Sequence, residues 1–126
     1  MNRDEFVKKY YDIAKRALEF SEKARREGLL ALEEKFDRKK IEDRDIFEYG
    51  IRFVIDGTDQ GIIDDILSNI INQEKDENTR TLKSIQKEAV LRIQEGMNPR
   101  TLYLLLNSYT DISLREDELK EAYGIW

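Results

Sequence analysis

Apolar residues along this chain recur at the spacing of α-helices. In the N-terminal part they follow one another in alternating steps of four and three residues, and side chains at this spacing lie along one face of a helix. The pattern predicts a long first helix over residues 4–36, and its apolar stripe consists of Phe6, Tyr10, Ile13, Ala17, Phe20 and Ala24. Two acid-first pairs, Glu19/Lys23 and Glu22/Arg26, are expected on its solvent face.

The middle of the chain predicts a short buried helix followed by an amphipathic one. Residues 46–55 are apolar nearly all round, which is typical of a helix buried in a core. Asp43 or Asp45 is expected to cap its start, and Gly57 is expected to end it. Thr58 is the expected N-cap of the next helix, whose apolar stripe consists of Ile62, Ile63, Ile66, Leu67, Ile70 and Ile71.

The second half of the chain divides less clearly, because residues 72–80 contain no apolar side chain. This polar stretch fits either a solvated part of one long helix or a loop between two helices. The helical pattern resumes over residues 82–93 and stops at Gly96. Asn98 followed by Pro99 then predicts the start of a further helix.

The pattern as a whole predicts five or six helices and no sheet, since no stretch keeps the period-two alternation of a strand. Ser113 and Glu116 form a capping box that opens a short last helix, which ends before Gly124. We expect a single compact all-α domain over residues 1–126. Its expected parts are 4–71, a polar junction at 72–80, a second part at 81–112 and the C-terminal helix at 113–126.

The composition removes several classes of function. The 126 residues are 39% charged with a net charge of −5, so a broad basic surface for nucleic acid is not expected. Cysteine and histidine are absent, which excludes disulfides, thiolate and imidazole catalysis and the usual zinc ligands. The sequence shows no secretory signal and no apolar run that could span a bilayer. We expect a cytoplasmic protein without a cofactor, a metal or a small-molecule substrate.

The most distinctive stretch is Ala-Arg-Arg-Glu-Gly-Leu-Leu-Ala-Leu-Glu at residues 24–33. It places Gly28 inside the predicted first helix, where glycine costs roughly 1 kcal/mol relative to alanine. We therefore expect a packing reason for Gly28, such as a neighbouring helix that presses closely against it.

Two blocks of the sequence together resemble the flagellar motor stator A-subunit family (MotA and its relatives, within the wider group of TolQ and ExbB proton channels). The first block is residues 24–33, followed by Phe47, Gly50-Ile51 and Val54-Ile55-Asp56-Gly57. It is similar to the cytoplasmic segment after the family's second membrane helix. The second block, residues 89–100, ends in Gly-Met-Asn-Pro-Arg and is similar to the segment after the fourth membrane helix. The resemblance covers about residues 10–112.

The resemblance implies a rotor-facing cytoplasmic module and not an ion channel. The family's four membrane helices are missing here, and the polar junction 72–80 stands where two of them would lie. Such a chain is either a natural membrane-free homologue or a splice of two cytoplasmic segments. In the family, one arginine and one glutamate of the first block contact charged residues of the rotor, and by position these match Arg25 and Glu33. The implied partner is the rotor switch-ring protein (FliG-like) or another motor component, at the inner face of the membrane near the motor.

Helix geometry supports a joint role for Arg25 and Glu33. On one continuous helix, eight residues rotate by about 80° and rise by ~12 Å, so the two charges lie on a similar side but too far apart to pair with each other. Two unpaired opposite charges at this spacing suit electrostatic docking, which sets orientation and association rate more than affinity. The competing interpretation is that both are ordinary charges of a solvated helix face.

Two other functions compete with docking. The first is a structural adaptor, a homo-oligomer that self-associates through the stripe of the first helix. The second is a metal-dependent enzyme, because four acids, Asp56, Asp59, Asp64 and Asp65, are a set that could bind magnesium. No base or lysine accompanies these acids in a catalytic pattern, so we expect no enzymatic activity. Trp126 is expected either to pack on the helices or to lie at an interface.

Overall fold

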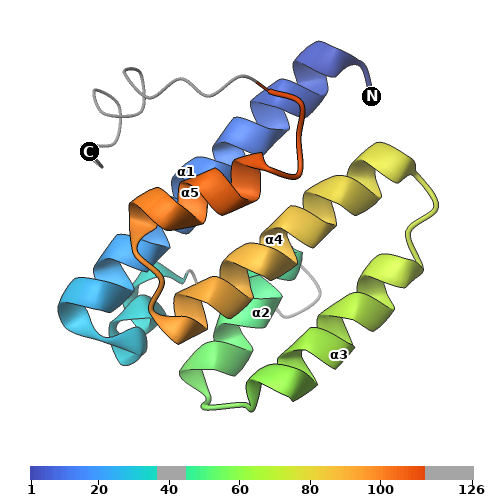
Figure 1. The fold of residues 1–126 in the computed structure, drawn as a ribbon. Helices are drawn as coiled ribbons and strands as arrows, with labels where there is room; N and C mark the ends of the chain where they lie inside the picture. The colour runs from blue at the N-terminus through green and yellow to red at the C-terminus, as the bar shows by residue number, and fades with distance from the viewer. Residues whose placement is uncertain (37–44, 113–126) are drawn as a thin grey trace.

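The computed structural model describes residues 1–36 and 45–112, and it confirms the all-α class (Figure 1). Within these ranges the regular structure is entirely helical. The elements are α1 (Arg3–Glu27), the 3₁₀ helix η1 (Leu29–Lys35), α2 (Ile46–Ile55), α3 (Gln60–Asn72), α4 (Glu77–Glu95) and α5 (Pro99–Asn107). None of the helices in the described ranges is both long and apolar enough to cross a membrane. The predicted capping box at Ser113 and the placement of Trp126 lie outside the described residues.

Helix α4 is the centre of the fold and packs against α1, α2, α3 and α5. Figure 1 shows α5 alongside α1 on one side of α4, whereas α3 lies at the opposite edge of the molecule. The stripe predicted for the first helix faces this centre, and Tyr10 and Ala17 are fully buried. Burial of apolar area on all sides of α4 is the main favourable contribution to folding.

The predicted start and end of α2 are confirmed. Asp45 is its N-cap, and the Asp45 side chain accepts a hydrogen bond from the backbone N–H of Glu48. The predicted cap of the next helix is wrong by one residue. Asp59 and not Thr58 caps α3, because the Asp59 carboxylate accepts the N–H of Gly61 at 3.0 Å. The Asp59 carboxylate can accept hydrogen bonds from the free N–H groups of the first turn. The positive end of the helix dipole also stabilises its negative charge.

The polar junction contains a loop between two helices and not part of one long helix. Helix α3 ends at Asn72, and α4 begins at Glu77. The Asp76 side chain caps α4 by accepting hydrogen bonds from both the N–H and the hydroxyl of Thr79. Arg80 donates two hydrogen bonds to the backbone carbonyl of Glu74, at 2.9 and 2.7 Å. Polar side chains thus supply hydrogen-bond partners for backbone groups of the turn between α3 and α4. The absence of apolar residues in this stretch reflects the turn of a helical hairpin.

The prediction of one continuous helix over residues 4–36 is wrong. Helix α1 ends at Glu27, and Gly28 adopts φ 92° and ψ 162°, a backbone conformation that is essentially restricted to glycine. The chain then changes direction into η1, which packs against α1 and α2. A Cβ atom built on Gly28 would have no neighbour within 4 Å, so the expected close contact with another helix is also wrong. Gly28 is needed for its backbone geometry.

Close packing against a glycine occurs instead at Gly50 in α2. A Cβ atom at Gly50 would lie 2.8 and 2.9 Å from the two methyl groups of Val90 in α4, and 3.0 Å from a methyl group of Leu67 in α3. The missing side chain therefore lets α2 approach α4 and α3 at the point where the three helices meet.

Candidate partner-binding site

The break at Gly28 places the two predicted rotor-facing charges on different elements. Arg25 lies in the last turn of α1, and Glu33 lies in η1. The rotation of 80° and the rise of 12 Å for a continuous helix therefore do not apply. Both residues are exposed to solvent, as the docking hypothesis requires.

Arg25 is held by a contact within the molecule. Its Nη1 donates a hydrogen bond of 3.1 Å to the backbone carbonyl of Gly96, just beyond the end of α4. One turn earlier, the hydroxyl of Ser21 donates to the carbonyl of Met97 at 3.1 Å. Carbonyl groups at the end of a helix carry partial negative charge, which favours a cation at this position. Arg25 thus joins the end of α1 to the turn between α4 and α5.

Glu33 also has a partner, and the prediction of two unpaired charges is wrong. Nη1 of Arg52 in α2 lies 2.6 Å from Oε1 of Glu33, and Asp56 lies 3.6 Å from the same guanidinium group. The hydrogen bond from Arg52 to Glu33, followed by the charge of Glu33, raises the pKa of Arg52 above its usual value. Arg52 is 39% and Glu33 53% exposed, so solvent screens the pair and it orients η1 more than it stabilises the fold.

A lysine connects α1 with η1. The Lys23 ammonium group lies 3.1 Å from Glu27 and 3.0 Å from Glu34, whereas the sequence had paired it with Glu19. Hydrogen bonds to Glu34 and then to Glu27 raise the pKa of Lys23. The second predicted pair is confirmed, because Arg26 lies 3.7 Å from Glu22.

The surface at this junction carries an exposed apolar side chain among its charges. Leu30 is 75% exposed, the largest exposed fraction of any large apolar side chain in the described residues. It follows Arg25 and Arg26 and precedes Glu33 and Glu34, which are all exposed. We name these five residues the α1–η1 corner. All five side chains are therefore accessible to a partner.

Three of the four acids that suggested magnesium have other roles. Asp59 caps α3, and Asp56 lies beside Arg52. Asp64 accepts hydrogen bonds from Nζ of Lys87 at 2.8 Å and from the hydroxyl of Ser68 at 3.1 Å. Across residues 1–36 and 45–112, no three acidic side chains are grouped in a way that could hold a metal ion.

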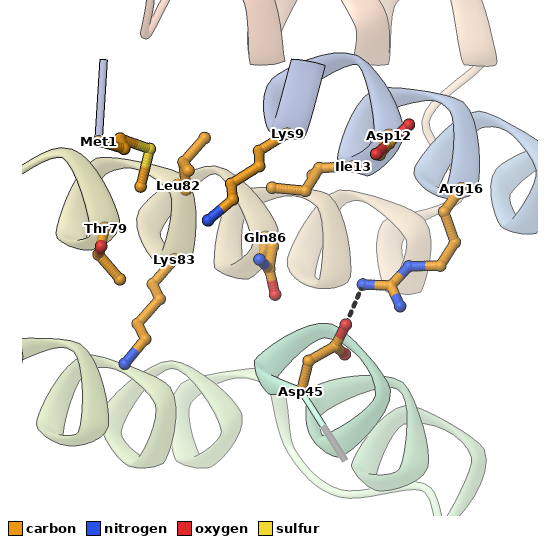
Figure 2. Close-up of a pocket in the computed structure, with 10 residues that line it drawn as sticks. All are labelled: Met1, Lys9, Asp12, Ile13, Arg16, Asp45, Thr79, Leu82, Lys83 and Gln86. Carbon is orange, nitrogen blue, oxygen red and sulfur yellow. Dashed lines mark ion pairs between the residues drawn. The ribbon is translucent and has the colours of Figure 1, made fainter. Parts of the chain in front are cut away.

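Sequence reasoning missed a pocket of about 430 Å³ between α1, α4 and the start of α2 (Figure 2). Ten side chains line it, including Lys9 and Arg16 from α1, Asp45 at the start of α2, and Lys83 from α4. These residues come from three segments that only the tertiary fold brings together. The sequence therefore carries no local signal for this pocket.

Comparisons of the whole sequence with protein-family models, with curated proteins and with solved structures give no match. The function proposed below therefore depends on the residues of this chain and on the resemblance of its two sequence blocks.

Proposed function

We propose that this chain is a non-catalytic protein-interaction module of the flagellar motor, which docks on the rotor switch-ring protein through the α1–η1 corner. In this proposal it works in the cytoplasm, at the inner face of the membrane near the motor. The observation that supports the docking surface most is the 75% exposure of Leu30 between exposed arginines and glutamates. The identity of the partner comes from the resemblance to the stator family.

The corner combines the two contributions that protein docking uses. Leu30 offers apolar area that is in water in the free chain, and covering it on binding is favourable. Arg25, Arg26, Glu33 and Glu34 form a rim with both signs of charge, which steers a partner of complementary charge and fixes its orientation. Contacts from Arg25 to Gly96 and from Glu33 to Arg52 hold this rim in place before the partner arrives.

The competing adaptor has less support. Its proposed contact surface is the stripe of the first helix, and the structure buries Tyr10, Ala17 and Phe20 inside the domain. Self-association through these side chains would first require opening the core. Assembly of several copies through another surface is compatible with the docking proposal.

The test is a binding titration against the rotor switch-ring protein at about 50 mM and 200 mM salt. We expect the affinity to fall as salt rises, because exposed charges are screened within about 10 Å at 0.1 M. Leu30→Ser should weaken binding by about fivefold or more, the effect of removing a residue that contributes over 1 kcal/mol. Arg25→Glu should weaken binding and also reduce its salt dependence.

The matched control is Lys15→Glu, which reverses an exposed charge of α1 outside the corner. Its binding should fall much less than that of Arg25→Glu, although both variants change the net charge equally. Melting curves must first show that each variant is folded, because Arg25 also contacts the carbonyl of Gly96. Equal affinities for the wild type, Leu30→Ser and Arg25→Glu would reject the corner as the docking surface. Absence of binding at both salt concentrations would reject the rotor protein as the partner.

A further inference from the structure

The pocket between α1, α4 and the start of α2 lies apart from the α1–η1 corner and is not used by the proposed docking. Its volume of about 430 Å³ is within the range of roughly 300–1,000 Å³ that small-molecule sites occupy. Part of its lining is apolar, because Met1, Ile13 and Leu82 contribute to it. Met1 is 39% exposed, whereas Ile13 and Leu82 are nearly buried and present only small apolar surfaces. The wall can therefore cover a short hydrocarbon chain.

Two of the three basic side chains in the pocket already have acidic partners. Arg16 lies 2.6 Å from Asp45, as the dashed line in Figure 2 marks, and its guanidinium group also stacks over the Phe47 ring at 4.6 Å. Lys83 lies 2.9 Å from Glu74. These contacts fix both side chains and neutralise their charges.

Lys9 differs from the other two. Figure 2 shows its side chain extending from α1 into the pocket, with the ammonium group directed toward Gln86 of α4. Among the residues that the structure describes, Lys9 makes no ion pair. An ammonium group has three donors and no acceptor, so Lys9 presents an uncompensated positive charge to whatever enters the pocket.

Gln86 supplies a second donor beside Lys9. Its Oε1 accepts the backbone N–H of Phe47 at 3.1 Å, which fixes the orientation of the amide. The Nε2 group is then directed toward the pocket (Figure 2). Within the described part of the chain this Nε2 has no hydrogen-bond acceptor. Both donors therefore line the same pocket as Ile13 and Leu82.

We propose that this pocket binds an organic monocarboxylate with a short apolar chain. The carboxylate accepts hydrogen bonds from Nζ of Lys9 and Nε2 of Gln86, and the hydrocarbon chain covers Ile13 and Leu82. Asp12, which also lines the pocket, carries a negative charge that opposes a second negative charge on the ligand. An inorganic dianion has no hydrocarbon chain to cover Ile13 and Leu82, so the site favours the organic monocarboxylate.

The test is an amide chemical-shift titration of the full chain with hexanoate at constant ionic strength and neutral pH. Hexanol serves as the uncharged analogue, and inorganic sulfate, which is a dianion at neutral pH, serves as the doubly charged one. We expect hexanoate to shift the amides of Ile13, Leu82 and Gln86 and to bind more tightly than either analogue. Lys9→Met, which keeps an apolar stem and removes the charge, should weaken hexanoate binding by about twofold to fivefold, the value of a solvent-exposed ion pair.

Asp12→Asn gives a test of opposite sign. Removing its negative charge should strengthen hexanoate binding and leave hexanol binding unchanged, an outcome that loss of folding cannot produce. Lys15→Met, outside the pocket on the same helix, is the control and should bind hexanoate like the wild type. The proposal is overturned if hexanol binds as tightly as hexanoate, if Lys9→Met has no effect, or if the shifts do not map to the pocket. None of these outcomes depends on the rotor protein, so this site and the docking proposal are tested separately.

Discussion

Gly28 and Gly50 show that the same residue type serves two different needs in this molecule. Gly28 provides a φ of 92°, whereas Gly50 provides room for Val90 and Leu67. The sequence around Gly28 contained the information for a helix end, because two basic residues precede the glycine and such residues favour the last turn. Apolar residues that continue past Gly28 made the helix appear longer. Gly50 could not be interpreted from sequence, since its neighbours are distant along the chain.

Gly50→Ala is expected to destabilise the domain. Alanine is the better helix former by roughly 1 kcal/mol, but overpacking costs about 1–3 kcal/mol, and the fully buried, β-branched Val90 cannot move its methyl groups easily. Three contacts at 2.8, 2.9 and 3.0 Å place the overpacking cost in the upper part of this range. We therefore expect a net loss of roughly 1–2 kcal/mol in the free energy of urea unfolding.

Gly61→Ala is the matched control, because its Cβ would meet only one atom, a carboxylate oxygen of Asp59 at 3.1 Å, and no side chain of another helix. That variant should be about as stable as the wild type. A Gly50→Ala protein of unchanged or increased stability would show that α2 and α4 can separate without cost.

At the scale of elements, helix ends were predicted well from sequence where a recognisable capping residue or glycine marks them. The bounds of α2 were predicted correctly because Asp45 and Gly57 mark both of its ends. The polar junction remained ambiguous because polar residues suit a solvated helix and a loop equally well. The structure forms a hairpin of α3 and α4 there, and two ion pairs link its parts. Asp64 of α3 lies 2.8 Å from Lys87 of α4, and Glu74 in the turn lies 2.9 Å from Lys83 of α4.

This hairpin is expected to weaken in acid. Hydrogen bonds from Lys87 to Asp64 and from Lys83 to Glu74 lower the pKa values of both carboxyl groups. A depressed carboxyl pKa stabilises the folded state above the unfolded-state pKa of about 4, and this contribution is lost as the pH falls below it. The wild type should therefore lose more unfolding free energy between about pH 6 and 3 than an Asp64→Asn/Glu74→Gln double variant.

Urea unfolding at a series of pH values measures this difference. Asp65→Asn is the control, because Asp65 is an exposed residue of the same helix. Parallel pH profiles for the wild type and the double variant would mean that these two pairs do not contribute to acid sensitivity.

At the scale of the whole molecule, the interior contains a tyrosine, Tyr10, that ionises only with difficulty. Tyr10 and Tyr103 are fully buried, and Tyr11 packs against Tyr10 with ring centroids 5.4 Å apart. Burial, and then the neighbouring phenol groups of Tyr103 and Tyr11, raises the pKa of Tyr10 far above its ordinary value. The apolar stripe predicted Tyr10 as a core residue, but not the tyrosine that meets it from α5.

Tyr10 therefore couples alkaline titration to unfolding. Because its folded-state pKa is raised, its neutral form stabilises the fold below the unfolded-state pKa of about 10, and this contribution is lost as the pH rises above that value. We expect the phenolate absorbance of the wild type to show a late component that coincides with loss of helical circular dichroism. Tyr10→Phe should reduce that component. Complete ionisation in a protein that is still helical would contradict a closed core around Tyr10.

The placement of α1 against α4 and α5 has a consequence for how the chain is made. α1 is synthesised first, yet the helices that cover its stripe come later, and the ion pair between Arg3 and Asp111 joins positions 108 residues apart. A ribosome adds about 5–20 residues per second, so the stripe stays uncovered for several seconds of synthesis. During that time the nascent chain presents Tyr10, Ala17 and Phe20 to its surroundings.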